Sequence, residues 1–403
     1  EGMQGMSQMQ GMPQMTGLEG MSSGRNLEGA YSPTNLNMDA YSPVMNGNDV
    51  GMNITNPNQV EGLNQIPLHM RNDVLSSLNN IQIKWSFKGK SLMANIGKTS
   101  DIIDAVETIR IQANNIEFEV DAQGEGETLI LCLHGWPEHS ITWRFQMSHF
   151  ANLGYRVWAP NLRGYGNSDI PKGMKNYQIE ILMKDVAGII EASGAKEVIL
   201  LSHDWGALIA WHFAMRYPNM ISRLIICNVP HPAQFIRSMK TLEQWMRSWY
   251  VLFFQIPWLP ELLTRKFKTG QLIKSGAARA ARKRNYPDDV VQLYDDNGSR
   301  QSNRTAMFNY YRALLRGGGL YRQWKLGFPM IDIPTLMLWG EKDIALSIRS
   351  TLGTEEHVAN LTLRYLKGIS HHVQQDAPEE VNHMIEAFLK AHEVPEYLDI
   401  KND

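Results

Sequence analysis

The sequence predicts an α/β protein built on a mostly parallel, doubly wound sheet, and three observations carry that prediction. From about residue 106 onward, apolar runs typical of strands alternate with segments of helical spacing. Runs such as residues 129–133 and 224–227 are apolar throughout, as expected of strands that are buried on both faces. Gly-rich loops follow several strand ends, and in such sheets reactive groups gather at the carboxyl ends of the strands.

The individual elements follow in order from residue 106. Residues 106–124 predict two strands joined by a tight turn at Asn114-Asn115. Residues 177–194 have helical spacing and end on Gly194, a residue suited to close a helix. The other strand-like segments share a polar or Gly-rich end, and they are residues 129–135, 155–166, 197–206, 223–230, 335–343 and 363–372. A helix is predicted at residues 208–218, directly after the third of these segments.

Composition divides the chain into an N-terminal tail, a linker, a core and an insertion. Residues 1–80 contain no lysine or tryptophan, and Met recurs at every third position from Met3 to Met15, a period of neither helix nor strand. We expect this low-complexity tail to be disordered, with a soft-metal site or a membrane-adhesive patch as the alternative. Residues 81–105 are the expected linker. Residues 106–230 and 329–403 are the expected α/β core, and residues 231–328, where the alternation lapses, are an expected helical cap inserted between two strands.

Charge and cysteine content narrow the functional class. A formal net charge of −2 gives no general attraction to nucleic acid. Cys132 and Cys227 lie in predicted buried strands, so we expect no disulfide framework and a reducing compartment. The most apolar stretch, residues 249–263, is interrupted by Pro257 and Pro260 and is too short to span a bilayer. We expect a cytoplasmic or membrane-associated protein, since a signal or anchor upstream of Glu1 is compatible with this sequence.

A carboxylate stands at the sharpest predicted turn. In the segment SHDWG (residues 202–206), small residues flank Asp204 at a strand-to-helix turn, which is the arrangement of a nucleophile elbow. Asp is ionised at neutral pH and needs no base to attack. Asp204 alone equally fits an N-cap of the next helix. Asp343 and a histidine, His371 or His372, complete the chain order nucleophile, acid, histidine, which favours the nucleophile.

These motifs resemble those of the epoxide hydrolases of the α/β-hydrolase fold, over roughly residues 106–392. In that family the base lies three residues after a glycine and three before a glutamine, a spacing that identifies His371. His372 stands where the family commonly has tryptophan, and we expect it to line the site. The segment His134-Gly135-Trp136-Pro137 resembles the oxyanion-hole motif of the family. The resemblance implies that the backbone N–H groups of Trp136 and Trp205 hold the oxyanion, while His134 and Pro137 shape the loop beside the substrate.

Two cap tyrosines distinguish the reaction. Opening an epoxide generates an alkoxide, and a tyrosine phenol can donate a proton or a hydrogen bond to it at neutral pH. The family places one tyrosine in a Y-x-x-x-F-Q context and another in N-x-Y-R, which Tyr250 and Tyr311 match. The alternative is that both are ordinary half-buried core tyrosines.

The resemblance therefore implies an epoxide hydrolase that forms a hydroxyalkyl ester on Asp204 and releases a vicinal diol after His371, oriented by Asp343, activates water. We expect no cofactor or metal, and the aromatic cap favours a lipophilic epoxide. One alternative is a dehalogenase with the same Asp-His-Asp triad, in which indole N–H groups hold the halide. Another is a non-catalytic α/β-hydrolase that binds partners. The basic cluster at residues 265–284 is an expected solvated surface, with membrane association as its alternative, and the sequence predicts no particular oligomeric state.

Overall fold

The computed structural model describes residues 85–87, 90–92, 106–266, 268–279 and 285–396. The chain divides into two units, Glu1–Ile66 and Pro67–Asp403, and every described residue belongs to the second unit. The expected tail, residues 1–80, lies outside the described residues. Within the expected linker the structure describes β1 (Trp85–Phe87) and β2 (Lys90–Leu92), which pair in antiparallel fashion.

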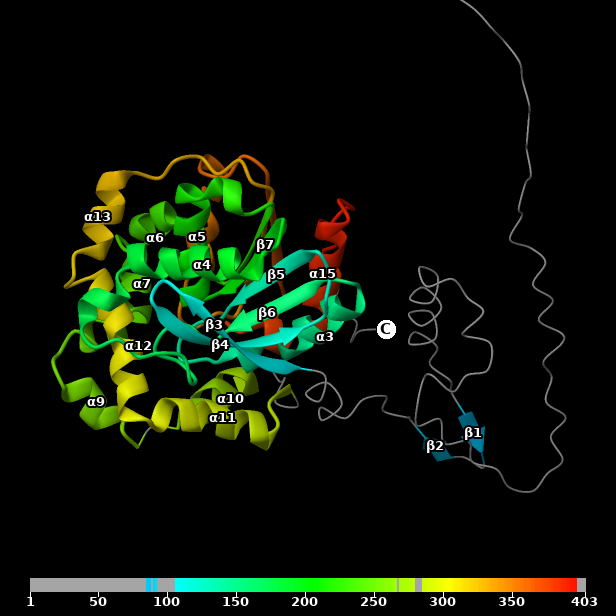
Figure 1. Cartoon of the computed structure of the whole chain (residues 1–403), viewed down its shortest axis with the longest axis horizontal. Coiled ribbons are helices and arrows are strands. Elements are labelled where there is room, and N and C mark those ends of the chain that lie inside the picture. Colours follow the sequence, from blue (N-terminus) through cyan, green and yellow to red (C-terminus); the bar gives the residue numbers. More distant parts are fainter. Residues whose placement is uncertain (1–84, 88–89, 93–105, 267, 280–284, 397–403) are drawn as a thin grey trace, which may run out of the picture. The chain divides into compact units, whose positions relative to one another are not determined.

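An eight-stranded sheet forms the core of the second unit (Figure 1). Its strand order is β10-β9-β8-β7-β5-β6-β4-β3, and the strands from β5 to β10 pair in parallel. The strands are β3 (Glu107–Ala113), β4 (Ile116–Gln123), β5 (Thr128–Leu133), β6 (Arg156–Pro160), β7 (Glu197–His203), β8 (Arg223–Cys227), β9 (Thr335–Gly340) and β10 (Leu361–Leu366). The predicted mostly parallel sheet is thereby confirmed.

The last two strands of the sheet, β4 and the edge strand β3, are the antiparallel exception: β4 pairs antiparallel with both β6 and β3. β3 and β4 pair along their whole length and are joined by Asn114 and Asn115, whose φ angles are 48° and 62°. Two successive positive φ angles match the twist of a two-residue hairpin, and Asn is among the residues that adopt them. The predicted Asn-Asn turn is confirmed.

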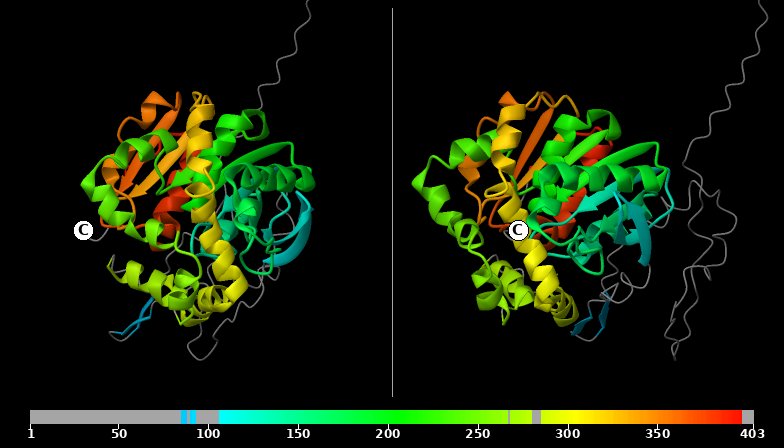
Figure 2. Two further views of the ribbon diagram at one scale, coloured as in Figure 1. Left: turned by 90° about the vertical axis from the view of Figure 1, so that its left-hand side faces the viewer. Right: turned by 60° about the vertical axis from the view of Figure 1, so that its left-hand side comes forward.

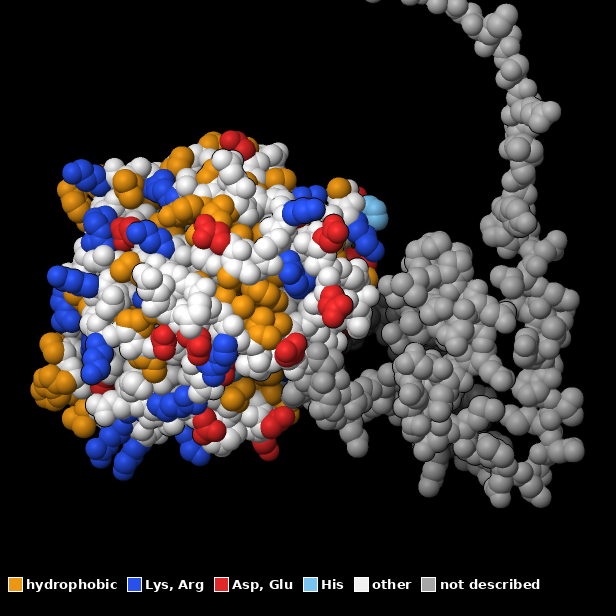
Figure 3. Space-filling view, in the orientation of Figure 1, with side chains coloured by type: hydrophobic (Ala, Val, Ile, Leu, Met, Phe, Trp, Pro, Cys, Tyr) orange, Lys and Arg blue, Asp and Glu red, His pale blue; other side chains and the backbone are white. Residues whose placement is uncertain are grey.

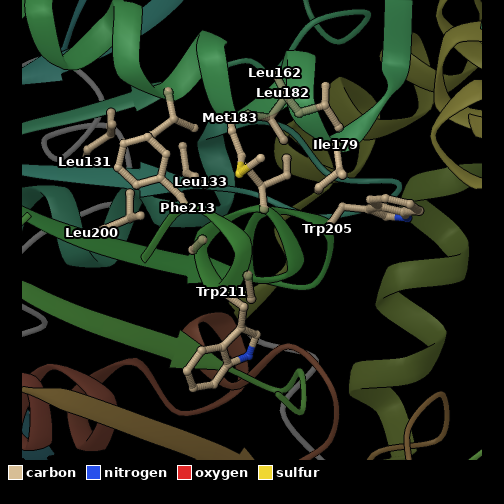
Figure 4. Close-up of a cluster of buried hydrophobic side chains, with 14 of the residues drawn as sticks. Leu131, Leu133, Leu162, Ile179, Leu182, Met183, Leu200, Trp205, Trp211 and Phe213 are labelled. Atoms are coloured by element: carbon tan, nitrogen blue, oxygen red, sulfur yellow. The ribbon is translucent and has the colours of Figure 1, made fainter. Parts of the chain in front are cut away.

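Helices cover both faces of the sheet, which explains why the central strands are apolar throughout. Successive residues of a strand point to opposite faces. On β5, Leu131 packs in a cluster with Phe213 beneath α4 (Ile179–Ser193) and α5 (Trp205–Arg216), as Figure 4 shows. Its neighbour Ile130 packs in a second cluster with Phe150 of α3 (Arg144–Asn152) and Ile385 of α15 (Pro378–Leu389).

Between β8 and β9 the described residues form helices and no strand, as predicted for residues 231–328. We call this segment the helical insertion. Its helices are α6 (Pro232–Ser238), α7 (Leu242–Arg247), α8 (Trp249–Phe253), α9 (Leu259–Thr264), α10 (Thr269–Arg279), α11 (Asp288–Ser299), α12 (Gln301–Leu314) and α13 (Gly319–Leu326). In Figures 1 and 2 the helices α10, α11 and α12 lie together along one side of the core. In the described part of the chain, no helix combines the length and the apolar character needed to cross a bilayer.

Candidate active site

Asp204 occupies a strained turn between β7 and α5. Its backbone angles, φ 47° and ψ −120°, are rarely adopted by residues other than glycine, and such strain tends to persist at functional positions. The turn also requires Gly206, because a Cβ there would lie 2.2 Å from the carbonyl oxygen of Leu133. Although Asp204 is the residue before α5, its side chain makes no capping hydrogen bond. The simple N-cap interpretation is therefore wrong.

The Asp204 carboxylate lies between a backbone donor and a histidine. Its Oδ1 accepts a hydrogen bond of 2.6 Å from the Trp136 N–H, and its Oδ2 lies 3.5 Å from Nε2 of His371. Gly135 makes this approach possible, since a Cβ on it would lie 2.3 Å from the Asp204 Cβ. One oxygen is thus held in place while the other faces an imidazole. The Trp205 N–H, the second donor expected from the sequence, belongs to the first residue of α5.

His371 joins the two carboxylates. Its Nδ1 lies 2.7 Å from Oδ2 of Asp343, which leaves Nε2 to face Asp204. Asp343 is itself held by the N–H groups of Ala345 and Leu346, at 2.7 and 2.9 Å, and by the Asn228 side chain at 2.7 Å. The three residues come from the ends of β7, β9 and β10, which share one edge of the parallel sheet.

Asp204, Asp343 and His371 shift one another's pKa values. Burial by itself raises the pKa of Asp204, but the interaction with His371 outweighs it and holds that pKa below its ordinary value. Burial likewise raises the pKa of Asp343, and the charge of His371 again reverses the effect. Burial lowers the pKa of His371, yet the charge of Asp343 and the contact with Asp204 raise it well above its ordinary value. In the free protein the group is an imidazolium between two carboxylates.

Tyr250 on α8 and Tyr311 on α12 face each other next to Trp136, the residue whose N–H holds Asp204. Their ring centroids are 6.0 Å apart, and they lie 6.1 Å and 5.9 Å from the ring of Trp136. Burial, followed by the negative charge of Asp204, raises the pKa of Tyr250. Burial, followed by Tyr250 and then Asp204, raises the pKa of Tyr311. Both phenols therefore carry their protons at neutral pH. The neighbouring Tyr310 instead donates its hydroxyl to the carbonyl of Arg163 at 2.8 Å.

The motifs around the two tyrosines bind each other. Arg312 donates to the carbonyl of Phe254 at 2.9 Å and forms a two-point ion pair with Glu261, at 2.6 and 3.0 Å. Gln255 donates to the carbonyl of Tyr311 at 3.2 Å. Arg312 and Gln255 thus attach α12 to the end of α8, which fixes the relative position of the two phenols.

The remaining predicted residues lie below or beside the Asp204 carboxylate. His134 is fully buried, accepts from the Leu162 N–H at 3.0 Å through Nε2, and donates to the Gly135 carbonyl at 2.9 Å through Nδ1. Burial lowers its pKa to about 4, so it is neutral, and both ring nitrogens are occupied by backbone groups. Pro137 follows Trp136 through a cis peptide bond. Contact of either side chain with substrate stays a prediction.

Glu138 and His203, which the sequence analysis did not predict as site residues, form a buried pair that contacts Gly135 and His371. Glu138 accepts from the Gly135 N–H at 2.9 Å and from Nδ1 of His203 at 2.7 Å. Nε2 of His203 lies 3.0 Å from the carbonyl of His371, so both ring nitrogens face acceptor oxygens. Burial raises the pKa of Glu138, but the charge of His203 lowers it well below its ordinary value. Glu138 directly follows Pro137 and His203 precedes Asp204, so proximity in sequence was the available signal.

His372 is the unusual member of this cluster. Its ring centroid lies 5.3 Å from those of His371 and His203, and Nε2 lies 3.9 Å from Oε1 of Glu138. Neither ring nitrogen has a hydrogen-bond partner among the described residues. Burial lowers its pKa to about 3, which keeps the ring neutral. Of the two histidines that the sequence left open, only His371 contacts both Asp204 and Asp343.

No group of three or more His, Cys, Asp or Glu within residues 106–266, 268–279 and 285–396 is arranged to hold a metal ion.

A mostly parallel sheet with an acid, a histidine and a second acid at its carboxyl edge defines an α/β hydrolase. The family model described as "alpha/beta hydrolase fold" matches residues 128–376. Epoxide hydrolase 4 of Homo sapiens is 36% identical over 289 residues, 70% of this chain and 78% of the relative. Epoxide hydrolase 2 of Caenorhabditis elegans is 33% identical over 284 residues, 69% of this chain and 79% of the relative. The chain belongs to the epoxide hydrolase family.

Solved structures agree with this assignment. A crystal structure of an epoxide hydrolase from Bacillus megaterium in complex with an inhibitor is 33% identical, with a TM-score of 0.62. The match covers 70% of this chain and all of the bacterial chain. Residues 128–376, which match the family model, contain the strands β5 to β10 and the helical insertion.

Proposed function

We propose that this chain hydrolyses epoxides to vicinal diols through a hydroxyalkyl ester on Asp204. One observation carries the proposal: Asp204 contacts both the Trp136 N–H and His371, next to two phenols that retain their protons. The named relatives support hydrolysis of an epoxide, and residues 231–328 act as the cap that supplies the phenols. The aromatic surroundings of the phenols favour a lipophilic substrate.

The first step uses the free oxygen of the nucleophile. Asp204 Oδ2 attacks a ring carbon while Oδ1 stays on the Trp136 N–H, and the carbon–oxygen bond of the epoxide breaks. The departing oxygen receives hydrogen bonds and then a proton from Tyr250 or Tyr311. A positioned acid of this kind contributes about 10²–10⁴ to the rate.

The second step depends on a change in the pKa of His371. Forming the ester removes the charge of Asp204, so the imidazolium keeps only one of the two carboxylates that raised its pKa. Its pKa falls, its proton returns to the tyrosinate that formed when the alkoxide was protonated, and neutral Nε2 becomes a base. Water attacks Cγ of Asp204 and gives its proton to His371. The developing oxyanion at Oδ1 faces the Trp136 N–H, with the Trp205 N–H as the second donor. The ester C–O bond then breaks, the leaving alkoxide takes the remaining proton of the attacking water, and Asp204 becomes a carboxylate again. The diol leaves, and the resting ion pairs return.

The test is to stop the reaction between the two steps. His371→Gln keeps a side chain of similar size without a base, so one equivalent of epoxide should add the mass of the substrate to the protein, detected by intact-mass spectrometry. Asp204→Asn should give no adduct and no diol. Steady diol production by His371→Gln would contradict the mechanism, as would an adduct located on any residue other than Asp204.

One observation favours dehalogenation as the second candidate. The indole Nε1 of Trp136 is buried without a hydrogen-bond partner, and an indole N–H is the type of donor that a leaving halide binds. Two protonated phenols argue against this reaction, because a halide leaves without a proton. Matched epoxide and haloalkane substrates separate the two, through diol formation against halide release. A folded protein that forms neither product nor adduct would be a non-catalytic binding protein.

A further inference from the structure

The outer side of the helical insertion exposes large apolar side chains that the fold does not bury. Residues 242–256 repeat such side chains at intervals of three and four, which places them on one helical face. Their exposed fractions lie between 41% and 74%, and Trp258, just before α9, is 70% exposed. We use the name tryptophan patch for six of these exposed apolar residues: Leu242, Trp245, Met246, Trp249, Leu252 and Trp258.

The patch lies on helices whose opposite side is well packed. Helical hydrogen bonding continues from α7 to α8, because the Ser248 N–H bonds to the Gln244 carbonyl and the Val251 N–H bonds to the Ser248 carbonyl. On the inner side Gln244 is fully buried and donates to the carbonyl of Ala345 at 3.2 Å, and Phe254 is also buried. The two helices are therefore anchored to the core through their inner side, and their apolar side faces outward.

Exposed large apolar side chains that adjoin one another on a surface are informative about what that surface contacts. The largest apolar patch on a typical monomer is about 300–600 Å², and larger ones mark contact with a protein or a membrane. Three of the six side chains are tryptophans, which favour the boundary between lipid and water because the ring is apolar and its N–H is polar. The composition of the patch thus matches the interfacial region of a bilayer.

The charged residues around the tryptophan patch indicate which kind of partner binds it. Residues 240–268 contain five basic residues, Lys240, Arg247, Arg265, Lys266 and Lys268, and two acidic ones, Glu243 and Glu261. Glu261 is bound by Arg312 and Glu243 by Arg247, and the other four basic residues are exposed. Figure 3 shows hydrophobic side chains beside Lys and Arg at the corner where Figure 1 places α9. Basic residues that flank an apolar helix face attract anionic headgroups, whereas two copies of the same basic surface repel each other.

We propose that the tryptophan patch binds the surface of an anionic lipid bilayer. The side chains of the patch enter the headgroup region, and the flanking lysines and arginines lie against the phosphates and carboxylates of the lipids. Tyr250 is on α8, between Trp249 and Leu252 of the patch, so the bound protein holds its candidate active site next to the bilayer. The proposal concerns binding and does not depend on the chemistry of the site.

Vesicle flotation with the full chain tests the proposal. Vesicles of phosphatidylcholine with 30% phosphatidylserine, a composition chosen for the assay, are compared with phosphatidylcholine alone, without any epoxide present. We expect the protein to float with the anionic vesicles, less with neutral ones, and less at high salt because the Debye length shortens. The double variant Leu242→Ser with Trp258→Ser removes two highly exposed side chains and should lower partitioning about tenfold or more.

Leu153→Ser is the matched control, because Leu153 is an exposed leucine at the end of α3, which packs against β6 of the core. It should float as the wild type does, and all variants should unfold at similar temperatures. Failure of the wild type to float, or equal flotation of the double variant, would overturn the proposal. A wild-type dimer that becomes monomeric in the double variant, with no flotation, would instead assign the patch to contact between copies. Loss of epoxide turnover with intact flotation would count against the proposed reaction alone.

Discussion

Replacing Gly135 by alanine should disable the nucleophile without removing any charged group. An ideal Cβ at this position would lie 2.3 Å from the Asp204 Cβ and 2.6 Å from its Oδ1. Ordinary contacts begin at 3.4 Å, so Asp204 or the Trp136 segment must move by about 1 Å. A displacement of about 1 Å at a reacting group lowers the rate by about 100-fold, equivalent to about 2.7 kcal/mol of transition-state free energy. Loss of the Trp136 N–H contact would lower it by a further ~10²–10³-fold at most.

The assay for Gly135→Ala is single-turnover formation of the Asp204 adduct, followed by quenching and intact-mass measurement. Gly188→Ala is the control, because Gly188 lies in α4 and a Cβ there meets Ala113 at 3.0 Å, away from the acid and base groups. We expect the control to retain its rate and both variants to keep cooperative thermal unfolding. A folded Gly135→Ala that forms the adduct within twofold of the wild-type rate would refute the reasoning.

Three other predictions concern the groups around the nucleophile. Tyr311→Phe should slow adduct formation by about 10²-fold in stopped-flow measurements, whereas Tyr310→Phe should lose about 1 kcal/mol of unfolding free energy and keep its rate. The pKa of His371 is higher in the folded protein than in the unfolded chain, where it is about 6.5, so protonation of His371 stabilises the fold. This contribution is complete below pH 6.5 and is lost as the pH rises through the pKa of the folded protein. Asp343→Asn should therefore flatten the decline of unfolding free energy above pH 6.5 in urea titrations at several pH values; an unchanged slope would contradict it. Arg312→Ala leaves a nearly buried carboxylate unpaired and should lower the unfolding free energy by about 3–5 kcal/mol, with loss of protection on α8 in hydrogen exchange as the local signature.

The proximity of three site residues could be predicted from their positions at strand ends. Asp204, Asp343 and His371 are far apart in the chain, yet parallel strands bring their carboxyl ends to one edge, so chain order sufficed to bring them together. The buried pair of Glu138 and His203 was missed because nothing in the local pattern indicates that two residues 65 positions apart bond to each other. His203 lies within the segment that contains Asp204, and Glu138 directly follows the segment of residues 134–137.

Which face of the helices α7 and α8 points to solvent could not be predicted from the sequence either. Residues 242–256 have the spacing of an amphipathic helix, and such spacing ordinarily indicates a face turned toward the core. In the structure that face is exposed, and polar Gln244 is buried against the core instead. Periodicity defines a face but not the neighbour that covers it, because the neighbour depends on the tertiary arrangement of other elements.

The placement of the helical insertion between β8 and β9 restricts how this protein can be shortened or recombined. β8 and β9 are paired parallel neighbours, so the chain leaves β8 at the carboxyl edge of the sheet and must return to the amino edge before β9 begins. A connection of this type needs about a dozen residues or more, usually a helix. Deletion of residues 231–328 with a short loop in their place would leave β9 and β10 unable to join the sheet. Exchange of this segment between relatives should succeed only when the donor segment spans the same distance.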